Sequence, residues 1–262
     1  MAASMRERAL VTGASVGIGR AFAEELALRG RDLVLVARDA ARLEQAAHDL
    51  SRRHSVAVEV LVADLLTDDG IAAVAARLAS LPAIDLLVNN AGRGSHGEFA
   101  AVPPSEHLEL LRLNVAALVE LTHAALRPML ERRHGAVLNV SSVAAFQPVP
   151  REAVYSATKA FVLQFTEALY EELRGTGVTV SALCPGLTHS EFQLRSGTEP
   201  TRLPSFMWQE ASAVARAGLD ALEAGRALVV PGLHNKVLGH LSNVTPRSLA
   251  RAASGAVVRR LA

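Results

Sequence analysis

The chain has 262 residues, half of them hydrophobic, and a formal net charge of +1. This length fits one large α/β domain better than two, and the hydrophobic content excludes a disordered chain. The near-neutral charge argues against nucleic-acid binding, as do the 4% of aromatic residues, which no basic stretch interleaves. The single cysteine, Cys184, excludes an internal disulfide, fits a reducing cytoplasm and lacks the companions of a zinc site, so we expect no metal.

The N-terminus and the apolar runs bear on location. Residues 1–8 are polar and charged, which leaves no room for the apolar core of a signal peptide. No uninterrupted apolar run reaches the length needed to span a bilayer. We therefore expect a soluble, cytoplasmic protein.

The glycine-rich stretch Thr12–Gly19 lies between a short apolar run and a helix predicted from about Arg20 to Arg29. Strand, glycine turn and helix form the context in which a glycine motif is informative. Gly13 permits the tight turn, Gly17 lets the backbone approach a pyrophosphate, and Gly19 lets helix and strand pack closely. The helix N-terminus offers free N–H groups to the phosphates. The predicted phosphate-binding residues are Gly13, Ser15, Gly17, Ile18 and Gly19.

The second predicted strand, Asp32–Ala37, reads as a strand buried on both faces. In dinucleotide folds an acidic residue at its end binds the adenosine ribose, whereas an arginine suits a 2′-phosphate. Ala37 occupies the place of the acid and Arg38 follows it, which favours NADP as the cofactor over NAD. In the alternative interpretation Arg38 only decorates the surface, and Asp39, a candidate helix N-cap, binds the ribose.

Strands and helices continue to alternate. We predict strands over residues 56–62, 84–88, 135–140 and 178–183, and helices over 67–81, 105–132 and 152–173, with Ser105 as an N-cap. This alternation predicts an α/β fold with a single doubly wound parallel sheet of the Rossmann type and helices on both faces. Ligands bind such sheets at the carboxyl ends of the strands. The clusters that follow the predicted strands are Asp64, Asn89–Gly92, Ser141–Ser142 and Cys184–Gly186.

Tyr155 and Lys159 lie four residues apart, and therefore on one face of the helix predicted over residues 152–173. A free phenol has a pKa of about 10. A nearby cation favours the phenolate, so we predict that Lys159 lowers the pKa of Tyr155 toward a value useful for proton transfer. Taken alone, the pair is more simply a half-buried aromatic residue beside a solvated lysine. The other motifs of the chain make the catalytic interpretation of the pair the preferred one.

Over about residues 8–190 the sequence resembles the short-chain dehydrogenase/reductase family. The resemblance rests on several motifs that occur in the family's order. It implies an oxidoreductase that transfers a hydride between NADP(H) and a carbonyl or secondary alcohol of a small substrate. The matching residues are Thr12–Gly19, Asp64, Asn89–Gly92, Asn114, Ser142, Tyr155, Lys159 and Pro185–Gly186.

The resemblance also implies catalytic roles. Tyr155 would be the general acid in reduction and the base in oxidation, and Lys159 would hydrogen-bond the nicotinamide ribose. Ser142, 13 residues before Tyr155, would donate to the substrate oxygen, which leaves Ser141 a structural neighbour. Asn114 would hold a water that links Lys159 to solvent; the alternative, a solvated polar residue on a helix, is disfavoured by its apolar neighbours.

Other residues would bind the cofactor by the same resemblance. Asp64 would contact the adenine, with a turn or a helix cap as the alternative. Asn90 and Gly92 would shape the adenine-ribose side of the cleft. Thr188 would bind the nicotinamide amide beside the matching Pro185–Gly186.

We expect one domain over residues 1–262 with two distinct segments. Residues 187–209 lose the alternation and are predicted to be a substrate lid, whose apolar residues indicate a hydrophobic substrate, although packing on the body explains them equally well. Residues 234–262 form a basic C-terminal segment that Pro246 divides. Such a tail can lie on an anionic membrane surface. We favour the alternative, in which it packs on the body or on a partner subunit of a homo-oligomer, a dimer or tetramer.

Two other functions compete with simple hydride transfer. A non-catalytic nucleotide-sensing binding protein would keep the fold and show a damaged Ser142–Tyr155–Lys159 set, but the set is intact. An enzyme that couples oxidation to isomerisation would differ in the cofactor consumed per product.

Overall fold

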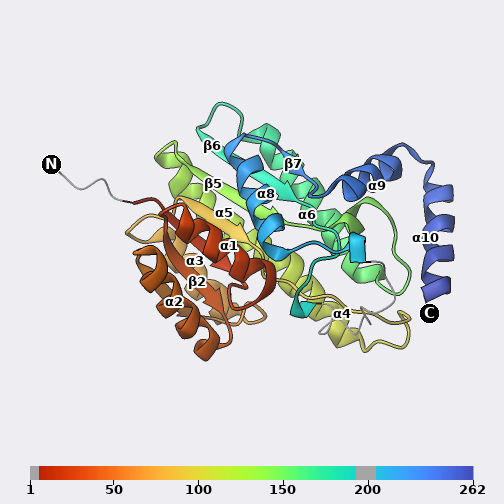
Figure 1. The fold of residues 1–262 in the computed structure, drawn as a ribbon, viewed down its shortest axis with the longest axis horizontal. Helices are drawn as coiled ribbons and strands as arrows, with labels where there is room; N and C mark the ends of the chain where they lie inside the picture. The colour runs from red at the N-terminus through yellow and green to blue at the C-terminus, as the bar shows by residue number, and fades with distance from the viewer. Residues whose placement is uncertain (1–5, 193–204, 262) are drawn as a thin grey trace.

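The structure is a computed structural model, and it describes residues 6–192 and 205–261 (Figure 1). Within these ranges the strands form one parallel sheet of seven in the order β3-β2-β1-β4-β5-β6-β7. The predicted doubly wound sheet is therefore confirmed. The strands are β1 (Arg8–Thr12), β2 (Asp32–Ala37), β3 (Val58–Val62), β4 (Leu86–Asn89), β5 (Gly135–Val140), β6 (Val178–Leu183) and β7 (Leu228–Val229).

Helices cover both faces of the sheet, because successive residues of a buried strand point to opposite sides. In β1, Val11 packs into the core shared with Phe22 of α1, whereas Leu10 packs into the core shared with Ile71 of α3. α2 and α8 lie on the first face, and α5 lies on the second. The helices are α1 (Gly17–Leu28), α2 (Ala40–His54), α3 (Asp68–Ala79), α4 (Pro104–Leu111), α5 (Ala117–Glu131), α6 (Ala153–Glu172), α8 (Ala211–Glu223), α9 (Leu233–Val244) and α10 (Arg247–Leu261).

The predicted element boundaries hold for β2, β5 and β6 and shift elsewhere. α1 begins at Gly17, three residues before the predicted start, so two of the motif's glycines lie in its first turn. The prediction of Ser105 as an N-cap is wrong: α4 begins at Pro104, whose missing N–H makes it suitable as the first helical residue. The helix predicted over residues 105–132 is interrupted by a π-turn, Arg112–Ala116, which joins α4 to α5.

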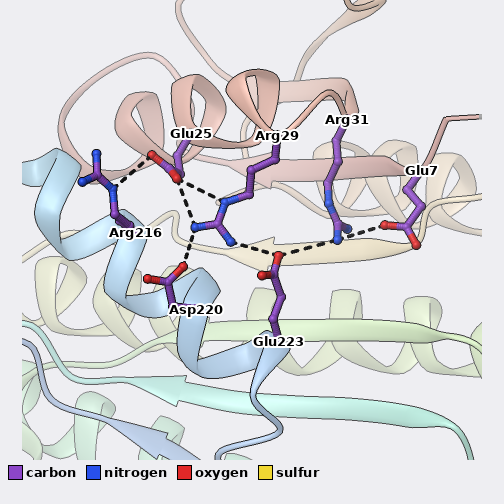
Figure 2. A network of polar contacts seen from close by, with 7 residues as sticks. All are labelled: Glu7, Glu25, Arg29, Arg31, Arg216, Asp220 and Glu223. Atoms are coloured by element: carbon purple, nitrogen blue, oxygen red, sulfur yellow. Dashed lines mark hydrogen bonds and ion pairs between the residues drawn. The ribbon is translucent and has the colours of Figure 1, made fainter.

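An ionic network joins α1 to α8 near the amino ends of β1 and β2. Arg29, 20% exposed, contacts Glu25 at 3.0 Å, Asp220 at 2.6 Å and Glu223 at 2.9 Å. The network therefore holds α8 on the sheet at the end opposite the predicted ligand site. Figure 2 shows the part of this network formed by Glu7, Glu25, Arg29, Arg31, Arg216, Asp220 and Glu223.

The C-terminal segment forms two helices, α9 and α10, which Pro246 separates as expected. α9 packs on the body: a Cβ atom at Gly239 would lie 3.1 Å from the ring of Phe146. Figure 1 places α9 and α10 at the end of the molecule where α4 lies. In the part of the chain that the structure describes, every helix is too short or too polar to cross a membrane.

Candidate active site

Tyr155 and Ser142 meet where β5 ends and α6 begins. Tyr155 lies in the first turn of α6 and is only 9% exposed. Ser142 hydrogen-bonds its phenol, and the Oγ atom of Ser142 also accepts the N–H of Ala144 at 3.1 Å. This second bond caps the short helical turn Val143–Phe146 and fixes the serine side chain. On its other side, the Tyr155 ring lies 5.7 Å from that of Phe192.

Lys159 lies beside Tyr155 but is bonded elsewhere. Its Nζ atom donates to the carbonyl oxygen of Val140 at 2.9 Å and lies 5.8 Å from the centroid of the Tyr155 ring. The lysine is only 6% exposed, and this burial lowers its pKa to about 8. Burial raises the pKa of Tyr155, and Glu152 raises it further. The prediction that Lys159 lowers the pKa of Tyr155 is therefore wrong for this arrangement, because loss of hydration outweighs the attraction between the two side chains.

Asn114 belongs to the π-turn and is 2% exposed, so it is not a solvated helix residue. Its Oδ1 atom accepts the N–H of Arg93 at 3.0 Å, and its Nδ2 atom donates to the carbonyl oxygen of Arg93 at 2.9 Å. Nδ2 also lies 3.2 Å from the hydroxyl of Thr158, the residue before Lys159. A π-turn is a common device at functional sites. Here it directs an amide into the space between the loop after β4 and α6.

The glycine loop is shaped for close approach of a ligand. Gly13 and Gly17 have φ of +67° and +57°, which favour glycine, and a Cβ atom at Gly19 would lie 2.1 Å from the carbonyl oxygen of Gly13. The Nδ2 atom of Asn90 donates to the carbonyl oxygen of Thr12 at 2.9 Å. Asn90 thus holds the glycine loop in its conformation.

The structure places Gly92 close to two of the predicted catalytic residues. A Cβ atom there would lie 3.1 Å from Asn114 and 3.6 Å from the Nζ atom of Lys159. The residue therefore lies on the catalytic side of the site, and a side chain at this position would crowd both groups. No local pattern indicates this proximity, because the contact joins three separate elements.

At the far end of the glycine loop, Arg38 directly follows β2 and is 65% exposed. It pairs with Asp64 at 3.8 Å. Asp39 uses its side chain to cap α2 by accepting the N–H of Arg42 at 3.0 Å, which favours the role of N-cap over that of ribose ligand. Asp64 accepts the N–H of Leu66 at 3.0 Å, the turn contact that we gave as its alternative. Arg38 is thus available to a 2′-phosphate, and the loop and this cation together fit NADP.

The loop after β6 completes the site. The hydroxyl of Thr188, 2% exposed, donates to the carbonyl oxygen of Gly186 at 3.0 Å, and Thr188 forms a bridge with Gln209. Both ends of the predicted lid therefore meet here, while residues 193–204 of that lid lie outside the described residues. The amide of Asn235 in α9 donates to the Oε1 atom of Gln209 at 3.0 Å and packs on Gly186, where a Cβ atom would lie 2.4 Å from it.

Two neighbours of the catalytic set have structural roles. Ser141 is buried and donates from Oγ to the carbonyl oxygen of Lys159 at 2.7 Å, so it fastens α6 to β5. Burial raises the pKa of the Cys184 thiol to about 12, which keeps it protonated and unreactive. In the described ranges, no group of histidine, cysteine and acidic side chains is arranged to hold a metal ion.

Comparison with known proteins assigns the chain to a family. Residues 7–200 match the sequence model of the short chain dehydrogenase family, and the chain belongs to that family. It is 33% identical to the very-long-chain 3-oxoacyl-CoA reductase of Mus musculus over 246 residues, which are 92% of this chain and 76% of that one.

Solved structures support the same family assignment. A short-chain dehydrogenase from Sphingobium yanoikuyae in complex with NADPH is 36% identical, with a TM-score of 0.83 over 91% of this chain and 96% of that one. The bulky-bulky ketone specific alcohol dehydrogenase from Comamonas testosteroni is 30% identical, with a TM-score of 0.80 over 94% of this chain and 97% of that one. The protein is therefore an NADP-dependent oxidoreductase that transfers a hydride to a carbonyl or from a secondary alcohol. A non-catalytic nucleotide sensor is not favoured.

Proposed function

We propose that the protein reduces ketones flanked by bulky apolar groups, with NADPH as the reductant and Tyr155 as the proton donor. The observation that carries this proposal is the buried Tyr155–Ser142 pair with Phe192 against the tyrosine ring. A phenol whose pKa burial raises stays protonated, which is the form that a general acid requires. The similarity to a 3-oxoacyl-CoA reductase and to a bulky-ketone alcohol dehydrogenase supports the choice of substrate.

Each of the catalytic side chains has its own role in this reduction. Bound NADPH supplies the hydride. Tyr155 gives its proton to the carbonyl oxygen, and Ser142, held by its bond to Ala144, donates a hydrogen bond that stabilises the charge developing on that oxygen. Lys159, with a pKa of about 8, is then a stronger acid than Tyr155 and restores its proton. Asn114, in contact with Thr158 beside Lys159, is placed to connect that lysine to solvent.

We give the cofactor residues the roles that the resemblance implies. Gly13, Ser15, Gly17, Ile18 and Gly19 approach the pyrophosphate, and Arg38 binds the 2′-phosphate. Thr188 lies with Pro185–Gly186 at the nicotinamide end. Asp64 borders the adenine, whereas Asn90 supports the glycine loop and Gly92 leaves room beside Lys159.

The test is NADPH oxidation over a graded panel of ketones. We expect kcat/KM to rise as the apolar groups on either side of the carbonyl lengthen, by about fourfold per buried methylene until the cleft is filled. Product analysis should give one alcohol per NADPH, which separates reduction from coupled isomerisation. A preference for small polar ketones, or no oxidation of NADPH with any member, would contradict the proposal.

We further propose that residues 1–262 form one domain in which the C-terminal segment packs on the body or a partner subunit, in a cytoplasmic homo-oligomer. The contact between α9 and Phe146 supports packing on the body. Co-sedimentation of the full chain and of a version ending at Gly232 with anionic vesicles tests this. Equal, poor binding is expected, whereas salt-sensitive binding of the full chain alone would favour the membrane.

A further inference from the structure

A second ionisable pair lies beside Tyr155, and the catalytic scheme does not use it. His96 belongs to the loop after β4, and Glu152 lies just before α6, three residues and about one helical turn from Tyr155. The Nδ1 atom of His96 is buried and lies 3.6 Å from the Oε1 atom of Glu152. The two side chains are 27% and 24% exposed, so each is half-buried and still accessible.

The backbone holds this pair in place. The N–H of Gly97 donates to the carbonyl oxygen of Arg151 at 2.9 Å, which ties the His96 loop to the segment that leads into α6. Arg151 has φ of +66°, in the left-handed region that side chains other than glycine rarely adopt. Such strain persists only where the surroundings fix it, and it clusters at ligand-binding sites. The pair is therefore preorganised relative to Tyr155.

The charges of the pair limit what it can bind. Burial raises the pKa of Glu152, and the neighbouring His96 opposes that rise. An anionic ligand group would be repelled by Glu152 whenever that carboxyl ionises. A cation would have to compete with His96 for the same carboxylate. A neutral hydrogen-bond acceptor fits best, because an imidazole ring carries at least one N–H donor whether it is neutral or protonated.

We propose that His96 and Glu152 form a substrate subsite that donates a hydrogen bond to a second carbonyl oxygen close to the one that Tyr155 protonates. Glu152 lies near enough to Tyr155 for its charge to act on the phenol, so a substrate with two carbonyls separated by one carbon can reach both the pair and the phenol. The substrate class is then a 3-oxoacyl thioester or a 1,3-diketone with an apolar chain. This inference rests on the proposed ketone reduction and narrows its substrate.

The test compares two substrates that differ in one group. One is a long-chain 3-oxoacyl N-acetylcysteamine thioester, and the other is the same molecule with a methylene in place of the thioester carbonyl. We expect the wild type to favour the dicarbonyl compound in kcat/KM by roughly 10- to 100-fold, because the compound without the second carbonyl leaves a buried donor unpaired. His96→Leu should remove this preference. His96→Gln, which still offers an N–H group, should keep much of it.

The control is His48→Leu, on the exposed side of α2, which should leave kcat/KM unchanged for both substrates. Equal loss of kcat/KM for both substrates in His96→Leu would mean that His96 only supports the fold around Tyr155. A wild type without preference would likewise overturn the subsite.

A binding measurement separates this inference from the proposed reaction. Tyr155→Phe protein loaded with NADPH is titrated with each compound and followed by cofactor fluorescence. Tighter binding of the dicarbonyl compound, lost on adding His96→Leu, supports the subsite even if no ketone is reduced by the wild type. Equal affinity for the two compounds, or no binding of either, overturns it.

Discussion

Replacing Lys159 by methionine should reveal how this buried, titratable side chain affects the stability of the protein. Burial lowers the pKa of Lys159 from 10.5 to about 8. The folded-state pKa lies below the unfolded value, so the unfolded chain binds more protons between pH 8 and 10.5. The Lys159 contribution to wild-type stability is therefore least favourable below pH 8 and becomes less unfavourable as the pH rises through that window. At neutral pH the cost is about 3 kcal/mol, since one pKa unit corresponds to about 1.4 kcal/mol.

Methionine removes this titration and also leaves the carbonyl of Val140 without its donor, a loss of about 1–3 kcal/mol that does not depend on pH. The pH dependence is therefore the informative quantity. The free energy of unfolding of the wild type minus that of Lys159→Met should rise by about 2 kcal/mol between pH 7 and pH 9.5. Urea denaturation followed by circular dichroism at the two pH values measures it. A difference that stays constant would refute the idea that Lys159 is buried with a lowered pKa.

Four further substitutions test other parts of the structure. Tyr155→Phe should reduce turnover by roughly 10²–10⁴-fold with little change in NADPH affinity, and a variant that keeps half of the wild-type rate would exclude Tyr155 as the proton donor. Arg38→Ala should weaken NADPH binding about 10- to 100-fold and hardly alter NADH binding, whereas equal losses for both cofactors would assign Arg38 another role. Gly19→Ala should abolish measurable cofactor binding in a titration, because its Cβ atom would meet the carbonyl oxygen of Gly13 at 2.1 Å. Arg29→Met should lower the free energy of unfolding by about 1–2 kcal/mol and leave NADPH affinity unchanged, since its three carboxylate partners lie at the other end of the sheet; a matching fall in affinity would contradict that separation.

The parts of the fold that local pattern determines could be predicted from the sequence. The strands β2, β5 and β6 have the predicted bounds, because strands that are mostly buried leave a mostly apolar run in the sequence. β7 has only two residues, Leu228–Val229, too few for any periodicity. The π-turn was also missed, since its residues fit an ordinary helix equally well and the extra residue is visible only in the hydrogen bonds.

The residues that form the site could be predicted from the sequence, but most of the contacts between them could not. Spacing alone places Tyr155 and Lys159 on one face of α6, but the direction of their pKa shifts depends on burial by other elements. Asn90 and Asn235 act through contacts with distant backbone and side chains, which no local pattern records. His96 and Glu152 lie 56 residues apart, and neither stands in a motif that drew attention.

The π-turn between α4 and α5 has a consequence for how this protein can change. The N–H of Ala117 bonds the carbonyl oxygen of Arg112, five residues back, where an α-helix would reach back four. Deleting one residue there would let α4 and α5 join in one continuous α-helix, with better hydrogen bonds than before. Yet each α-helical residue turns the chain by about 100°, so Asn114 or everything after it would swing to another side. Point substitutions can tune this enzyme gradually, whereas a single-codon deletion here would leave a sound helix and a misdirected amide.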